Sequence, residues 1–470
     1  MLKNNNEKGA ISRRRMLRLM GASGAGLALA ACAPVAQPAA APAKSAAEPA
    51  KQEPTKEVAP TTAPAAASEA GEMKLLICCS GPDETDLRSK WNAEFEKTHP
   101  GLKIIQEAPP AGANYFEKLQ TLIAANTPPD LFDMWEGYVQ PYAENGALTD
   151  LEPFLANDPK IKKGDIVPAA IEAGSWQGKV YAMLFGFMPG PVSLYYNPAH
   201  FEKAGIAEPT ADWKWDDVKT AAKKLTVDSN GDGVPEQWGF AFSSWFVNWL
   251  YTIWSNGGDM LNKEQTQSTL TDPKVVEAVQ YWADLVAKDK VAPDASAMEV
   301  LKGNMPAFKG GQISMVLGNY WDVGDLKTAK DFKWKAVLTP KANNGNRVWY
   351  MHTGCWSISP PSKFQNTGWE YIREFVINRV IEPLVPYIPP LASAQQSFFD
   401  VPLHKDLGYG ALTNLVTKPD ILRIPGAGAK FDKIAGMIQS EIDQVVVGKK
   451  SAADAMAAAA PLVDGELARK

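Results

Sequence analysis

The sequence has few residues of the kinds that build metal centres, disulfide frameworks and membrane spans. It contains four cysteines and four histidines in 470 residues, and no C-x-x-C, H-E-x-x-H or G-x-S-x-G motif. These absences argue against a structural zinc site and against the common metalloprotease and serine-hydrolase centres. No uninterrupted run of about 18 or more strongly apolar residues occurs, which argues against a polytopic membrane domain. We therefore expect no bound metal and no cofactor.

Positive charge is also scarce outside the first 31 residues. Residues 1–31 hold six of the 48 Lys and Arg and one of the 53 Asp and Glu, so the rest of the chain has 42 basic against 52 acidic residues. An acidic protein of this kind lacks the basic face that general nucleic-acid binding requires. Hydrophobic residues make up 45% of the sequence and Trp occurs 15 times, which is enough apolar side chain for a large packed core.

The N-terminal residues have the pattern of an export signal, which we assign to residues 1–31. A basic stretch, 12–18, precedes a weakly apolar run, 19–31, which is too short to span a bilayer. The order Ser-Arg-Arg-x-hydrophobic-Leu-basic favours twin-arginine export over the ordinary Sec route. Leu29-Ala-Ala-Cys32 resembles a bacterial lipobox, so we expect lipidation of Cys32 rather than a buried thiol. Residues 33–72 are rich in Ala and Pro and predict a disordered tether.

Three cysteines remain once Cys32 is assigned to the anchor. Cys78 and Cys79 end a predicted strand, where small buried side chains are expected, and Cys355 lies far away in the sequence. The sequence does not decide whether these residues form a disulfide.

Strands and helices are expected to alternate from residue 73 onward. Strands are predicted at 74–79, 102–106 and 130–134, with helices at 84–98 and after Asn114, because apolar residues recur there at helical spacing. This βαβαβ order implies a parallel sheet, in which ligands bind beyond the carboxyl ends of the strands, here 80–84 and 134–138. Later helices are predicted at 215–225, 274–288, 368–377, 431–447 and 451–467, and strands at 313–317, 335–338 and 354–359. No repeat of about 20–50 residues is visible, which disfavours a solenoid.

Several segments in a fixed order resemble the extracytoplasmic solute-binding proteins of ABC importers, specifically the maltose-binding-protein-like group called family 1. They are 118–130 (KLQTLIAANTPPD), 145–151 (NGALTDL), 178–183 (GKVYAM), 194–197 (LYYN), 201–206 (FEKAGI), 215–218 (WDDV), 308–318 (FKGGQISMVLG) with Trp321, and 448–456 (GKKSAADAM). The resemblance spans about residues 73–468. Each segment is weak alone, and their order carries the identification.

The resemblance implies an α/β, two-lobed type II periplasmic-binding-protein fold with crossovers between the lobes and a ligand cleft. Lobe 1 is expected at 73–187 plus 338–392, and lobe 2 at 188–337 plus 393–470. The chain is expected to cross between lobes near 185–192 and near 338–341. Such crossings act as hinges when the lobes close on a ligand.

A sugar site needs aromatic platforms for the apolar ring faces and polar side chains for the hydroxyls. Trp is frequent at the predicted strand ends and cleft loops, whereas Trp91, Trp282 and Trp369 lie on helical stripes and are expected in the core. The predicted ligand contacts are Trp321, Trp135, Glu136, Trp245, Trp249, Tyr320, Asp322, Trp356, Asp83, Glu84, Asn319 and Gly258. For Asp83 and Glu84 the alternative role is to cap the following helix.

One segment resembles the first half of a calcium loop. Asp228, Asn230 and Asp232 place oxygens at alternate positions, but Gly239 stands where the loop's final Glu is expected. A polar turn without metal is the favoured interpretation, and structural calcium stays the alternative.

The function that the resemblance implies is that of a monomeric, lipid-anchored receptor on the outer face of the cell membrane. It would capture a sugar or oligosaccharide by lobe closure and deliver it to the transmembrane subunits of an ABC importer, without catalysis. One alternative is a receptor for a polyamine, which suits acidic and aromatic side chains. A second is a receptor for a glycerol-phosphate, for which only scattered cations such as Lys341 and Arg347 are candidates. The third is a secreted glycoside hydrolase that uses Glu136 and Asp322.

Overall fold

The computed structural model describes residues 69–78, 82–109, 115–329, 331–383, 387–413 and 421–469, which all belong to one compact unit that begins at Ala63. The predicted export signal, Cys32, Cys79 and nearly all of the predicted tether lie outside these ranges. The tether was predicted to extend to residue 72, but strand β1 begins at Gly71, two residues earlier. None of the helices in these ranges combines the length and the hydropathy needed to cross a membrane.

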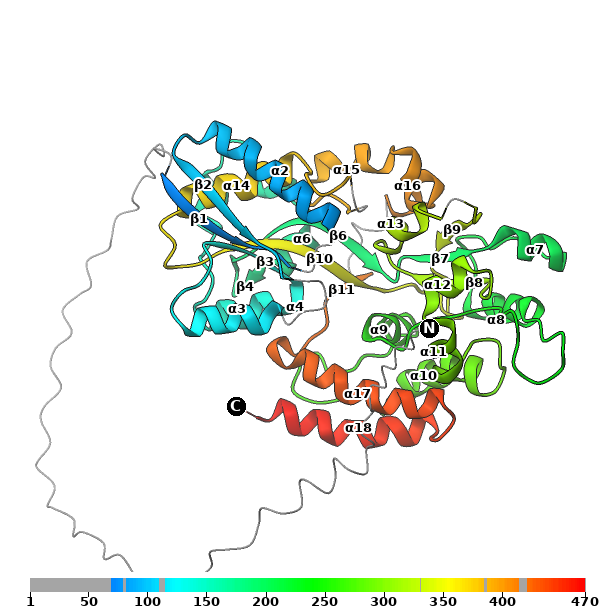
Figure 1. The fold of residues 1–470 in the computed structure, drawn as a ribbon. Coiled ribbons are helices and arrows are strands. Elements are labelled where there is room, and N and C mark those ends of the chain that lie inside the picture. The colour runs from blue at the N-terminus through cyan, green and yellow to red at the C-terminus, as the bar shows by residue number, and fades with distance from the viewer. Residues whose placement is uncertain are drawn as a thin grey trace, which may run out of the picture. The chain divides into compact units, whose positions relative to one another are not determined.

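The described residues form two larger sheets and one short two-stranded pair. The first of the larger sheets has the strand order β11-β10-β3-β1-β2, with β6 paired to β10 (Figure 1). β1 (Gly71–Leu76) pairs in parallel with both β2 (Leu102–Glu107) and β3 (Leu131–Met134), as the βαβαβ pattern predicts. β10 (Trp349–Ile358) runs antiparallel to β3 and to β6 (Met183–Gly190), and β11 (Leu422–Arg423) adds a short parallel edge. We call this sheet and the helices packed on it the first lobe.

Helix α2 (Pro82–Thr98) shows how the sequence pattern attaches a helix to this lobe. Trp91 and Phe95 lie one turn apart on the stripe that the spacing predicts. Both pack against Tyr371 of α14 (Gln365–Ile377), with ring centroids 6.4 and 5.2 Å away. The other elements of this lobe are α3 (Tyr115–Ala124), α4 (Glu136–Glu144), α5 (Glu152–Asn157), η1 (Lys163–Asp165), α6 (Pro168–Ala173), β4 (Ser175–Trp176) and β5 (Lys179–Val180).

The second sheet has three antiparallel strands in the order β8-β7-β9. They are β7 (Ser193–Tyr196), β8 (Met315–Gly318) and β9 (Lys335–Leu338). The helices that follow β7 and those at the C-terminus complete what we call the second lobe, in which α17 and α18 lie side by side (Figure 1). These helices are α7 (Pro198–Ala204), α8 (Trp215–Leu225), α9 (Phe246–Ser255), α10 (Pro273–Ala287), α11 (Ala295–Leu301), α12 (Asn304–Lys309), α13 (Asp322–Lys327), α17 (Phe431–Val446) and α18 (Ala452–Leu467).

The chain changes sheets where the sequence predicts its crossings. β6 ends at Gly190 in the first sheet and β7 begins at Ser193 in the second, while β9 ends at Leu338 and β10 begins at Trp349. Gly190 has no room for a side chain, because a Cβ there would lie 2.6 Å from Nε2 of His352. Between α14 and β11 the chain forms α15 (Ala392–Phe399), α16 (Pro402–Asp406) and η2 (Tyr409–Leu412), and η3 (Gly428–Lys430) leads into α17. The exact lobe limits remain predictions.

Candidate functional site

A cavity of about 310 Å³ is lined by residues of both lobes, and we call it the cleft. β3 and the start of α4 supply one wall, β10 supplies the floor, and the segments before α9 and after β8 supply the opposite wall. The lining residues are Cys78, Glu84, Arg88, Asp133, Met134, Trp135, Glu136, Phe185, Trp245, Phe246, Tyr320, Trp321, Tyr350, His352, Thr353, Gly354 and Tyr387.

Aromatic side chains from the second lobe form one wall of the cleft. Trp321 is half-buried and lies with its ring centroid 5.9 Å from that of Trp245 and 4.9 Å from that of Tyr320. Trp245 is 41% exposed, and Trp135 on the first lobe is 38% exposed. Large apolar rings left open to solvent in this way are typical of a binding surface rather than of a core.

The polar part of the cleft is built around one buried guanidinium. Arg88 on α2 is 2% exposed and donates to Oε1 of Glu84 through Nε at 3.2 Å and Nη2 at 2.9 Å. Its Nη1 donates to Oδ1 of Asp133 at 3.1 Å. The guanidinium also lies over the rings of Phe185 and Trp356, at 5.2 and 4.9 Å. Arg88 is therefore neutralised and covered by the protein itself.

Asp133 at the end of β3 is held by two fixed donors. Besides Arg88, the backbone N–H of Cys78 donates to its Oδ2 at 2.7 Å. Burial nevertheless raises the pKa of Asp133 to about 6, because the loss of water outweighs the attraction of the guanidinium.

Glu136 is the second buried carboxylate of the cleft. Its Oε2 accepts from the backbone N–H of Thr353 at 3.0 Å and from the Thr353 hydroxyl at 2.6 Å. Burial raises its pKa, and the hydrogen bonds from Thr353 and Tyr350 oppose that shift. The neighbouring His352 is held neutral, because burial lowers its pKa to about 3. Glu136 therefore ties the start of α4 to β10.

Two side-chain hydrogen bonds connect the lobes beside the cleft. The Tyr320 hydroxyl donates to that of Tyr387 at 2.8 Å, and Tyr387 belongs to the first lobe because the adjacent Ile388 pairs with Phe187 of β6. The Tyr138 hydroxyl on α4 donates to Asp432 on α17. These bonds require the lobes to lie close together.

The sequence profile named "Bacterial extracellular solute-binding protein" matches residues 81–372, which is more than half of the chain. The chain belongs to this family. Among curated relatives, the maltotriose-binding protein of Pyrococcus abyssi is 23% identical over 82% of this chain and 80% of its own length. The diacetylchitobiose binding protein DasA of Streptomyces coelicolor is 25% identical over 65% of this chain and 69% of its own.

Solved structures share the fold. The substrate-binding protein Lmo0181 of Listeria monocytogenes, solved in complex with cycloalternan, superposes with a TM-score of 0.73 at 24% identity. That match covers 86% of this chain and 100% of the other. Both the family and the two-lobed α/β fold that the sequence predicts are thereby confirmed, and the chain is an exported solute-binding protein.

The structure brings half of the predicted ligand contacts together in the cleft of this solute-binding protein. They are Trp321, Trp135, Glu136, Trp245, Tyr320 and Glu84. Asp83 lies in the first turn of α2, but its side chain is outside the described part of the structure. Contact of these residues with a solute stays a prediction.

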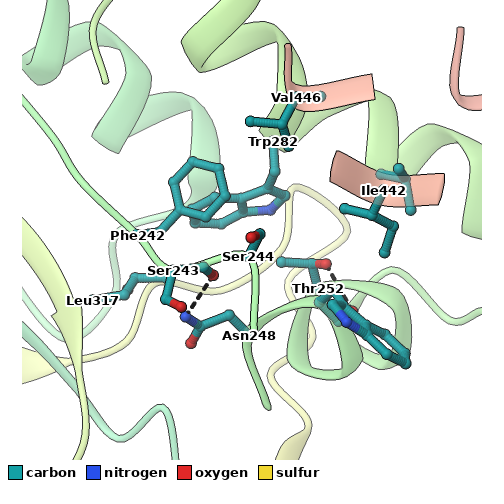
Figure 2. Close-up of a pocket in the computed structure, with 12 residues that line it drawn as sticks. Phe242, Ser243, Ser244, Asn248, Thr252, Trp282, Leu317, Ile442 and Val446 are labelled. Atoms are coloured by element: carbon teal, nitrogen blue, oxygen red, sulfur yellow. Dashed lines mark hydrogen bonds between the residues drawn. The ribbon is translucent and has the colours of Figure 1, made fainter. Parts of the chain in front are cut away.

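Trp356 and Trp249 were predicted as ligand contacts, and the structure places both elsewhere. Trp356 is fully buried beneath the Arg88 guanidinium, so Arg88 lines the cleft in its place. Trp249 is 4% exposed, and its Nε1 donates to Oε1 of Gln439 on α17 at 3.0 Å. It lines a separate cavity of about 20 Å³ between α9, α10 and α17 (Figure 2). Trp245 precedes α9 and remains open, whereas Trp249 lies one turn inside the helix and packs inward.

Three further predicted contacts do not line the cleft. Gly258 follows α9 and packs against α10, where a Cβ would lie 2.7 Å from Cγ2 of Val275. Asp322 begins α13, and its Oδ2 accepts the backbone N–H of Asn319 at 2.7 Å. Asn319 is 8% exposed behind the wall that Tyr320 and Trp321 form. Residues 319–322 are consecutive, yet only Tyr320 and Trp321 line the cleft. Their positions in the sequence do not reveal this difference.

Several lining residues were missed, and some of them carried a usable signal. Arg88 follows Glu84 by one helical turn, and Asp133 is a lone charge in the buried strand Leu-Phe-Asp-Met. A charge in a buried strand is unusual unless it pairs in a site, whereas Glu and Arg one turn apart are common on helix surfaces and gave a weaker signal. Tyr387 gave no such signal, because it comes from a segment outside any predicted element.

The carboxylate oxygens of the calcium-like loop accept hydrogen bonds from the backbone of the same loop. Oδ1 and Oδ2 of Asp228 accept the backbone N–H groups of Gly231 and Gly233, at 2.8 and 3.0 Å. Oδ1 of Asp232 accepts that of Val234 at 2.8 Å. Within the described ranges, no group of three or more His, Cys, Asp and Glu side chains could hold a metal ion. The loop is a polar turn.

Of the cysteines, Cys78 is disulfide-bonded and Cys355 is a buried free thiol.

Proposed function

We propose that this solute-binding protein is the receptor of an ABC importer that binds a sugar or oligosaccharide in the cleft. This proposal rests on one observation: Trp321 and Trp245 of one lobe line the same cleft as the carboxylates of Glu84 and Glu136 of the other lobe. Ring faces of a sugar suit the indoles and its hydroxyls suit the carboxylates. The relatives named for maltotriose and diacetylchitobiose, and the structural neighbour solved with cycloalternan, support a carbohydrate.

Closure follows from the placement of the contacts on two lobes. A solute that touches both lobes binds the closed form more tightly than the open one, and so shifts the population toward closure. The bonds Tyr138–Asp432 and Tyr320–Tyr387 join the two lobes, and we propose that closure on a solute keeps them. The closed lobes would then dock on the transmembrane subunits of the importer.

We further propose that the mature chain is a monomer held at the outer face of the cell membrane by acyl chains on Cys32. Acyl chains contribute about 0.8 kcal/mol per buried methylene, so two or three chains retain a protein of this kind at a bilayer. The twin-arginine motif supports export in the folded state. The test is to block the twin-arginine route and the Sec route separately and to measure export of the chain in each case.

Two alternative functions find less support in the geometry. A phosphate-bearing solute needs exposed cations. In the part of the chain that the structure describes, the one cation that lines the cleft is Arg88, which is bonded to Glu84 and Asp133. Lys341 pairs with Asp212 at 2.7 Å, away from the cleft. A glycoside hydrolase needs two carboxylates across the bond it cleaves, and of the candidate pair only Glu136 lines the cleft. We therefore propose binding without catalysis.

The experiment is a calorimetric titration of the full chain with mono- to hexasaccharides, followed by chromatography of the recovered sugars. The proposal predicts saturable binding of at least one sugar, which is recovered intact. Cleavage of the sugar, or binding of a glycerol-phosphate in preference to every sugar, would overturn it.

A further inference from the structure

The charges that line the cleft do not balance. Glu84, Asp133 and Glu136 contribute three carboxyl groups, whereas Arg88 contributes the one guanidinium. His352 adds no charge, because burial keeps its ring neutral near pH 7. Asp432 on α17 bonds to Tyr138. Burial raises the pKa of the Tyr350 hydroxyl, and the charges of Glu136 and, less strongly, Asp432 add to that shift. Among the described residues, no lysine and no second arginine lines the cleft.

This excess of negative charge destabilises the protein when no solute is bound. A buried carboxylate without a matching cation loses hydration that hydrogen bonds restore only in part. Asn or Gln could accept the same hydroxyl hydrogens of a neutral sugar without that cost. Burial raises the pKa of both Asp133 and Glu136, and for Asp133 the charge of Arg88 offsets that shift only in part.

Glu84 is the carboxylate that remains available to a solute. Its Oε1 takes both hydrogen bonds from Arg88, and among the described residues none donates to its Oε2. The side chain of Glu84 is 21% exposed, whereas that of Asp133 is 5% exposed. The negative charge of Glu84 acts on the hydroxyls of both Tyr320 and Tyr387, so its carboxylate lies near the point where the lobes meet.

The aromatic wall suits the same kind of solute. A cation over the face of a Trp or Tyr ring is attracted by the negative face of the ring, most strongly in sites shielded from water. Trp321, Trp245 and Tyr320 present such rings beside the acidic part of the cleft. Aromatic rings and the second carboxylate oxygen of Glu84, which Arg88 does not engage, together form a site for an ammonium group.

From this arrangement we infer that the transported solute carries a protonated amine, which pairs with Glu84 between the lobes. This inference rests on the proposed receptor function and narrows its substrate class to amine-bearing solutes. Two sources share this chemistry: an amino sugar, in which the amine replaces a hydroxyl, and a linear polyamine.

The test compares solutes that differ in the amine alone. The full chain is titrated calorimetrically with the glucosamine disaccharide, with its N-acetylated form, with the corresponding neutral glucose disaccharide and with spermidine, below the pKa of the sugar amine. We expect an amine-bearing solute to bind about tenfold or more tightly than its neutral counterpart, as one added charged contact supplies. Glu84→Gln should remove this preference, because it should weaken binding of the amine-bearing disaccharide about tenfold more than binding of the neutral disaccharide, whose hydroxyls a Gln oxygen still accepts.

Glu94→Gln is the matched control, because Glu94 lies on the same helix, is exposed and pairs with Lys97. This variant should keep the preference. Equal or tighter binding of the neutral disaccharide would overturn the inference and leave the proposed sugar receptor standing. If spermidine binds and none of the sugars does, the inferred amine on the solute is supported and the proposal that the solute is a sugar is overturned. An unchanged preference in Glu84→Gln would also overturn the inference.

Discussion

Replacing Trp321 by Ala removes the central ring of the cleft's aromatic wall, and we expect it to weaken solute binding about 20-fold. A buried Trp covers about 200 Å², and a solute resting on one face covers roughly a third of that, about 70 Å². At about 25 cal/mol per Å² this contact contributes about 1.7 kcal/mol, which corresponds to that change in Kd. Calorimetric titration with the tightest-binding solute measures the effect.

The control for Trp321→Ala is Trp334→Ala. Trp334 is also half-buried in the second lobe and packs on Tyr195 with ring centroids 5.7 Å apart, but it does not line the cleft. Its loss should lower the melting temperature and leave Kd unchanged. A Trp321→Ala protein that melts like the wild type and binds within about twofold of it would refute our assignment of the aromatic wall.

Three further predictions concern the buried charges and the anchor. Arg88→Met should lower the free energy of unfolding by about 3–5 kcal/mol at neutral pH, because it leaves Asp133 buried without its cation; chemical denaturation measures this, and a loss under about 1 kcal/mol would contradict it. Burial raises the pKa of Asp322 from 3.8 to about 6, so the folded chain takes up a proton that the unfolded chain does not. The contribution of Asp322 to stability should therefore rise as the pH falls from 7 towards 5, so the difference in melting temperature between the wild type and Asp322→Asn should shift in favour of the wild type over this range. Cys32→Ser should release the exported chain from the membrane fraction, whereas retention would disprove the lipid anchor.

Local sequence patterns predicted regular elements well where one periodicity dominated. Helix α8 and strand β9 have the predicted limits, 215–225 and 335–338, because amphipathic spacing and short apolar runs leave little choice there. Strand β10 was predicted to begin at 354 but begins at Trp349. Its first residues, Trp-Tyr-Met-His, are buried on both faces and show no alternation that marks a strand.

The cleft was predicted only in part, because its residues meet through tertiary contacts. Trp135, Trp245 and Trp321 stand at element ends, which the sequence can locate. The separation of Trp245 from Trp249 depends on where α9 begins and which face α17 covers. The pairing of Arg88 with Asp133 depends on how α2 crosses the sheet, which no spacing in the sequence encodes.

The central claim is that one solute bridges the two lobes through the cleft. A crystal structure of the chain with its tightest-binding solute tests this most directly. The account predicts that the solute contacts Trp321 of the second lobe and Glu84 of the first. A solute bound outside the cleft, or held by one lobe alone, would contradict it.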